Sequence, residues 1–79
     1  MRGRMRRYAV IQSERYLDSS GWPITLGELL LDLPHNTFQY KAEAVSLARK
    51  VNDANPNAPN KAYAATVWID VSGHKAGKS

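Results

Sequence analysis

Hydrophobic residues recur at helical spacing in one long segment, residues 40–52, which reads YKAEAVSLARKVN. The apolar stripe of this segment consists of Ala44, Val45, Leu47, Ala48 and Val51. A stripe of this period is typical of a helix that buries one face. Glu43 lies near the positive end of the expected helix dipole, and Arg49 and Lys50 lie near its negative end. The pattern therefore predicts a helix over residues 40–52 that packs on an apolar surface.

A second pattern, strict alternation, runs from Ala62 to Val71. One side carries Tyr63, Ala65, Val67, Ile69 and Val71, and the other carries Ala64, Thr66, Trp68 and Asp70. Alternation over this length predicts a half-buried strand, the longest of the chain. Residues 8–13 (YAVIQS) are rich in β-forming residues and predict another strand, with Arg15 and Tyr16 as its extension.

The segment from Asp18 to Pro34 begins with a turn signal and ends ambiguously. Residues 18–21 (DSSG) favour a turn, because Asp and Ser bond their own backbone and Gly accepts positive φ. Residues 22–25 (WPIT) fit an edge strand, since Pro23 donates no ladder hydrogen bond. Residues 26–33 fit either a strand or a short helix; Thr25 and Glu28 form a capping-box pattern that slightly favours the helix. We expect Pro34 to end either element.

These elements predict a small α+β fold, an antiparallel sheet with the helix of residues 40–52 across one face. We expect the helix stripe to meet Val10 or Ile11 and the face that carries Val67, Ile69 and Val71. Trp68 would then lie on the opposite face, either exposed or covered by residues 26–33. The expected organisation is a basic arm over 1–7, one domain over 8–71 and a polar tail over 72–79.

Composition narrows the class of protein. The chain has 79 residues, 43% of them hydrophobic, and no cysteine, which excludes a disulfide framework and a thiolate metal site. No apolar run is long enough for a membrane span, and no signal segment is recognisable, so we expect a cytoplasmic protein. The net charge of +4 belongs to the ends, because residues 16–70 carry four basic residues against six acidic ones.

No constellation of residues predicts catalysis, a metal or a cofactor. His35 and His74 show no ligand spacing with another histidine or carboxylate. The C-terminal GHKAGKS lacks the first glycine of a phosphate-binding loop and a helix after it. Residues 61–68 partly resemble the signature strand of RNA-recognition motifs, but alternation puts Tyr63 and Trp68 on opposite faces, where they cannot stack bases together. We therefore expect a protein that is not an enzyme and needs no cofactor.

Two functions remain open, and they use different residues. A protein-binding module would use exposed aromatic anchors, since aromatic residues dominate interface hot spots. Its candidate contacts are Trp22, Trp68, Arg15, Arg49 and Lys50. A nucleic-acid binder would use the basic N-terminal arm, because arginines neutralise phosphates. The arginines of that arm are Arg2, Arg4, Arg6 and Arg7.

The small size, the absence of cysteine and of a catalytic motif, and the charged ends resemble a family of proteins. These are the small inhibitors encoded by phages and mobile elements, anti-CRISPR proteins among them. The order strand–GW–strand–TF–KAEAVSLARK–strand is also similar to small bacterial domains of the strand–strand–helix–strand type. The inhibitor resemblance implies a non-catalytic partner that blocks a protein or nucleoprotein complex of host defence.

Overall fold

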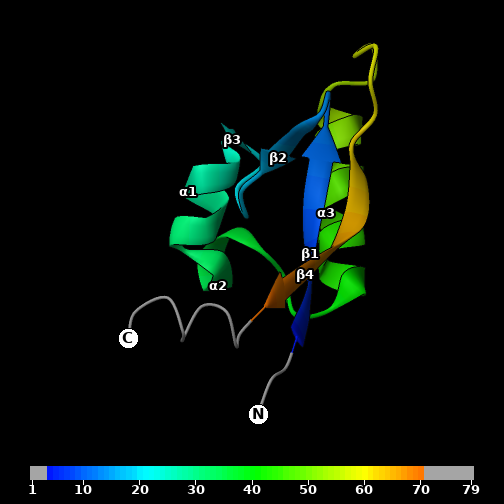
Figure 1. Ribbon diagram of the computed structural model, residues 1–79. Coiled ribbons are helices and arrows are strands. Elements are labelled where there is room, and N and C mark those ends of the chain that lie inside the picture. The colour runs from blue at the N-terminus through cyan, green and yellow to red at the C-terminus, as the bar shows by residue number, and fades with distance from the viewer. Residues whose placement is uncertain (1–3, 71–79) are drawn as a thin grey trace.

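Four antiparallel strands form one sheet in the order β3-β2-β1-β4 in the computed structural model, which describes residues 4–70 (Figure 1). The strands are β1 (Arg4–Gln12), β2 (Arg15–Leu17), β3 (Pro23–Ile24) and β4 (Tyr63–Asp70). Three helices accompany them: α1 (Leu26–Leu31), α2 (Leu33–Asn36) and α3 (Lys41–Ala54). The predicted α+β class is confirmed. Val71 and the predicted tail over 72–79 lie outside the described residues, as do residues 1–3.

The helix expected over residues 40–52 is α3, which lies along one face of β1 and β4 (Figure 1). The core forms between this helix and the sheet. Its buried residues are Val10, Leu17, Ala44, Ala48 and Ala62, with Tyr8, Phe38, Leu47, Val51 and Ala64 packed around them. All of the strand residues in this set that come from β1 and β4 have even numbers. The helix therefore packs on the even-numbered side of both strands.

The predicted choice of face on the last strand was wrong. Val67 and Ile69 lie on the side of β4 away from α3, and Ala64 lies on the side that the helix covers. Two features explain the outcome. Alanine against alanine lets a helix approach a sheet closely, which the larger Val and Ile would not allow. The chain entering α3 is also fixed by a backbone pair, in which Tyr8 N–H donates to Phe38 O (2.9 Å) and Phe38 N–H donates to Tyr8 O (2.6 Å).

β1 and β2 form a hairpin, so Arg15 and Tyr16 do not extend the first strand as predicted. The two residues between the strands, Ser13 and Glu14, have φ of 53° and 63°. Positive φ at both positions is the requirement of the two-residue type I′ turn, which Asn and Gly favour. The chain has neither residue there, and the sequence therefore gave no hairpin signal.

The turn predicted over residues 18–21 is confirmed. The Asp18 carboxylate accepts hydrogen bonds from the backbone N–H of Ser20 (2.9 Å) and of Trp22 (3.0 Å). Gly21 has φ of 89°, and a Cβ built on it would lie 3.4 Å from Val51 Cγ2. The glycine thus allows both the turn and its close contact with α3.

The ambiguous segment is helical. The predicted capping box forms at α1, since the Thr25 hydroxyl accepts from Glu28 N–H (3.1 Å) and Glu28 Oε1 accepts from Thr25 N–H (2.8 Å). Pro34 does not end the segment as expected, because it lies in the first turn of α2, where no intrahelical donor is needed. His35, expected in a loop, also belongs to α2.

β1 begins at Arg4, four residues earlier than the sequence predicts. Residues 4–7 pair with 67–70 of β4 in a regular antiparallel register. The polar sequence RMRR has no strand period of its own, and its pairing depends on the length of β4. Most of the expected basic arm is therefore part of the sheet.

The alanine contact between α3 and the sheet leads to a stability prediction. Replacing the buried Ala48 by Leu should lower the free energy of unfolding by ~1–3 kcal/mol, because the larger side chain must push α3 away from the sheet. Ala42→Leu, at an exposed position of the same helix, should change it by less than ~0.5 kcal/mol. Urea denaturation followed by circular dichroism measures both. Equal effects of the two substitutions would contradict the close packing.

Candidate functional site

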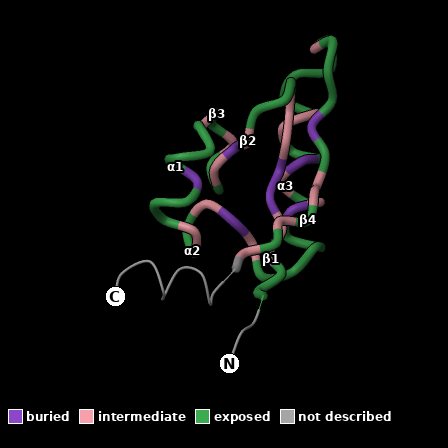
Figure 2. Tube along the Cα trace, viewed as in Figure 1, coloured by how far each residue is buried: buried purple, intermediate pink, exposed green. Residues whose placement is uncertain are grey.

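The sheet side opposite α3 presents an apolar surface on β1 and β4. We call this surface the open face, and its accessible apolar residues are Met5, Ile11, Tyr63, Ala65, Val67 and Ile69. Among the described elements, α3 covers the other side, and α1 lies against β2 (Figure 1). The open face is not accessible throughout, because Ala9 on the same side of β1 is fully buried. Met5 and Tyr63 are exposed, and Val67 and Ile69 are half-buried. Figure 2 shows that β4 consists of exposed and half-buried positions over residues 63–69.

Arg7 is the one charged residue of β1 and β4 on the open face, and its side chain is occupied. Arg7 Nε donates to Thr37 Oγ1 (2.8 Å), and a terminal nitrogen donates to Thr37 O (3.1 Å). Thr37 is only 3% exposed, and its hydroxyl donates in turn to Leu33 O (2.6 Å). The guanidinium therefore ties β1 to the segment between α2 and α3. It stabilises the fold and leaves the open face apolar.

The end of the sheet that α3 does not cover carries a second surface. The guanidinium carbons of Arg4 and Arg6 each lie 5.8 Å from the centroid of the Trp68 ring. This distance is within the range of cation–π attraction. Trp68 is 56% exposed, so residues 26–33 do not cover it. The prediction that it lies on the side opposite the helix was wrong, because Trp68 has the same parity in β4 as Ala64, which packs against α3. We call Arg4, Arg6 and Trp68 the basic–aromatic patch; Asp70 lies opposite Arg4 in the strand register.

The structure does not gather the residues predicted for protein binding into one site. Trp22 precedes β3, and Trp68 lies in β4, so the two indoles lie at opposite edges of the sheet. Trp22 is 70% exposed. Arg15 begins β2, and Arg49 and Lys50 lie on the exposed side of α3.

The arginines predicted for nucleic-acid binding have separate positions. Arg4 and Arg6 join the basic–aromatic patch, Arg7 bonds Thr37, and Arg2 lies outside the described residues. The open face was not predicted as a site, because its residues Val67 and Ile69 were expected to pack against the helix in the core. The alternation over residues 62–71 was the available signal, and it does not say which side the helix takes.

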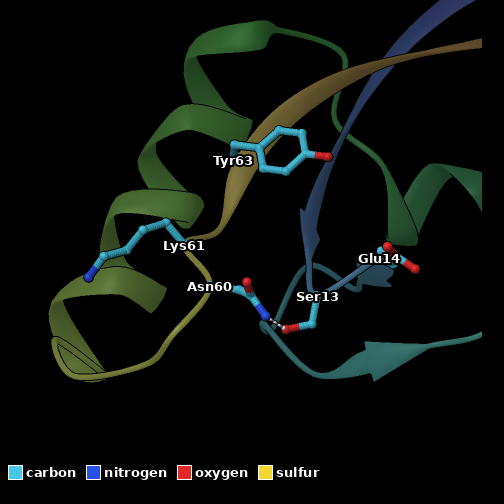
Figure 3. A pocket seen from close by; sticks show the side chains of 5 residues that line it. All are labelled: Ser13, Glu14, Asn60, Lys61 and Tyr63. Atoms are coloured by element: carbon cyan, nitrogen blue, oxygen red, sulfur yellow. Dashed lines mark hydrogen bonds between the residues drawn. The ribbon is translucent and has the colours of Figure 1, made fainter.

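A polar hollow of about 330 Å³ lies between the β1–β2 turn and the start of β4 (Figure 3). Its lining residues are Ser13, Glu14, Asn60, Lys61 and Tyr63. Asn60 Nδ2 donates to Ser13 Oγ (3.0 Å), and Lys61 Nζ donates to Pro56 O (3.1 Å). Glu14 points away from Lys61 (Figure 3). The hollow therefore brings no acid and base side chains together for proton transfer.

Within residues 4–70, no three His, Asp or Glu side chains converge in a way that would hold a metal ion. His35 Nδ1 lies 2.8 Å from Asp32 Oδ1, but both side chains are largely exposed and no third ligand joins them. None of the helices in this part of the chain has the length and hydrophobicity needed to cross a membrane.

Comparison of the chain with protein-family models, curated proteins and solved structures finds no match. A function is therefore inferred from the surfaces of the molecule itself.

The different positions of Arg6 and Arg7 lead to a second prediction. Arg7→Gln should lower the free energy of unfolding by ~1–3 kcal/mol, because it removes charge-assisted hydrogen bonds to the buried Thr37. Arg6→Gln should change it by less than ~0.5 kcal/mol, since Arg6 is exposed. Thermal denaturation of both variants measures the difference. A large loss in Arg6→Gln alone would contradict these assignments.

Proposed function

We propose that the protein is a non-catalytic binding module that occupies the surface of a protein or nucleoprotein partner through its open face. The observation that supports this proposal is the accessible apolar part of that face, where Met5 and Tyr63 are exposed and Val67 and Ile69 are half-buried. Contiguous apolar surface of this kind is typical of protein interaction sites, because removing it from water stabilises a complex.

The composition of the open face also fits a protein partner. Met5 and Tyr63, its most exposed residues, belong to types that are enriched at protein interfaces. Arg7, the charged residue there, already has its hydrogen bonds satisfied by Thr37, so a partner need not desolvate a free cation. An apolar surface on a sheet is also rigid, which lowers the entropic cost of binding.

The resemblance to phage and mobile-element inhibitors gives a narrower form of the same proposal. In this form the protein is an anti-CRISPR-like inhibitor that binds a host defence complex stoichiometrically and blocks it without chemistry. The observation that supports it is the combination of a small size with an uncovered apolar face and a basic–aromatic patch on one sheet. Such a protein would contact the protein part of the complex with the open face and its anionic part with the exposed Arg4 and Arg6.

The alternative function is nucleic-acid binding through the basic–aromatic patch. An exposed indole with two arginines beside it suits base stacking and phosphate contact. Two facts reduce the charge available for this role. Arg7 is bonded to Thr37, and Asp70 lies opposite Arg4. We therefore propose a protein partner as the first function and nucleic-acid binding as the alternative.

A charge placed on the open face tests the proposed function. After capture of a partner with the native chain, Val67→Glu should raise the Kd of the purified complex at least tenfold, or about 1.4 kcal/mol, because it puts a carboxylate in an apolar interface. Ser46→Glu, at an exposed position of α3, is the matched control and should leave the Kd within about twofold. Isothermal titration calorimetry measures both, after circular dichroism has verified the fold.

Titration of labelled duplex DNA, single-stranded DNA and RNA at two salt concentrations tests the alternative. On duplex DNA, binding through phosphates should weaken with salt with a log–log slope of about −0.9 per phosphate neutralised. Loss of binding in Arg4→Glu and Arg6→Glu, together with no effect of Val67→Glu on any partner, would replace the proposed function by nucleic-acid binding.

A further inference from the structure

β4 is an unusually open edge of the sheet. It is eight residues long, contains neither Pro nor Gly, and has no strand beyond it among the described residues. The other edge, β3, has two residues and includes Pro23, so it offers almost nothing to pair with. Natural sheets normally protect a long apolar edge, because its unpaired N–H and C=O groups recruit another strand. The lack of protection on β4 points to a strand that pairs with it.

The register shows which residues would pair. Tyr8 exchanges both of its backbone hydrogen bonds with Phe38, so the pair Tyr8–Thr66 is a non-hydrogen-bonded pair of the β1–β4 ladder. The N–H and C=O groups of Thr66 therefore point away from β1. By the two-residue period of the ladder, the same holds for Ala64 and Trp68. These three residues form the free edge, together with Asp70 at the end of the strand.

Asn52 marks where the free edge begins. Its side chain bonds Ala62 as a strand would: Ala62 N–H donates to Asn52 Oδ1 (2.8 Å), and Asn52 Nδ2 donates to Ala62 O (3.0 Å). The outward groups of Ala62 are thus satisfied within the chain. Those of Ala64, Thr66, Trp68 and Asp70 are the ones left for a partner strand.

We propose that the occupant of this edge is a second copy of the chain, paired antiparallel about a two-fold axis at Thr66. In this register Thr66 lies opposite Thr66 of the second copy, and Ala64 lies opposite the second copy's Trp68. The free positions Ala64, Thr66 and Trp68 of each strand are then used reciprocally, and Asp70 lies opposite Ala62, whose outward groups Asn52 already satisfies. The result is one continuous eight-stranded sheet with both α3 helices on the same side.

A groove between α3 and β4 favours this register. It has a volume of about 330 Å³, and its lining includes Val45, Ala48, Arg49 and Ala64. Ala64 and Trp68 project on the side of the sheet that α3 packs on. The pairing therefore places the second copy's Trp68 beside Ala64, at the groove. An indole that is 56% exposed in one copy would be buried there, next to the Arg49 of the other.

Helix spacing agrees with the same arrangement. α3 packs on both β1 and β4, so the two helices would be separated by about two strand spacings, or ~10 Å. This matches the ~8–10 Å between packed helices.

A cysteine at the two-fold axis tests the register directly, since the native chain has none. Thr66→Cys should form a disulfide between copies on mild oxidation, because directly opposed residues have Cα atoms ~5.5 Å apart. Ile69→Cys on the same strand should not, because its counterpart would lie six residues further along the ladder. Non-reducing electrophoresis distinguishes the two. Failure of Thr66→Cys to cross-link, or equal cross-linking of both variants, would overturn the proposed register.

Sedimentation velocity tests the dimer without a cross-link. The native chain should sediment with twice its mass of 8.8 kDa. Trp68→Ala should raise the dimer dissociation constant at least about tenfold, and Trp22→Ala at the opposite edge should leave it unchanged. Chemically synthesised chain with N-methylated Thr66 should also be monomeric, because it lacks the outward N–H donor.

Three results would overturn the proposal. The first is a native chain that stays monomeric at concentrations up to ~0.5 mM. The second is a dimer that Val67→Glu dissociates and Trp68→Ala does not, which would mean that copies meet through their open faces. The third is equal weakening by Trp22→Ala and Trp68→Ala. The proposed function does not depend on the dimer, because partner binding through the open face is measured separately.

Discussion

The close approach of α3 to the sheet is the constraint on which the rest of the structure depends. Ala44 and Ala48 of the helix are buried in one cluster with Ala62, and Ala64 packs against that cluster. The small side chains let the helix lie close to β4, and Val10 of β1 and Leu17 of β2 complete the same cluster. Because the helix takes the alanine side of β4, the side with Val67 and Ile69 faces away from it. The packing that builds the core thus also creates the open face.

Periodicity predicted the elements better than their assembly. The spacing of apolar residues was enough for α3 and β4, and the Thr25–Glu28 capping box was enough for α1, because these signals are local. The β1–β2 hairpin could not be predicted, since Ser13 and Glu14 adopt positive φ without the usual turn residues. The strand over residues 4–7 could not be predicted either, because it exists only through its pairing with β4.

The choice of sheet face is the step that mattered most for the candidate site. A clean apolar alternation normally marks the side that is buried against the core. Here that rule selected the wrong side, because the helix packs at Ala62 and Ala64, at the start of β4, and the backbone pair between Tyr8 and Phe38 holds the chain that enters the helix on that side. The alternation still identified an apolar surface, whose removal from water is favourable. Burial of that surface within one chain is incomplete, and this deficit is the physical reason for expecting a partner.

The two unprotected features of the sheet belong together. Odd-numbered residues of β4 bond inward to β1 and place Val67 and Ile69 on the open face, while even-numbered residues direct their backbone groups outward at the edge. Extension of the sheet at the edge would leave the open face uncovered and double its area, since both copies present it on the same side. A doubled flat apolar surface would let one assembly hold two sites of a symmetric or repetitive partner at high effective concentration. In the proposed arrangement the edge of the sheet would bind the second copy, and the open face would bind the partner.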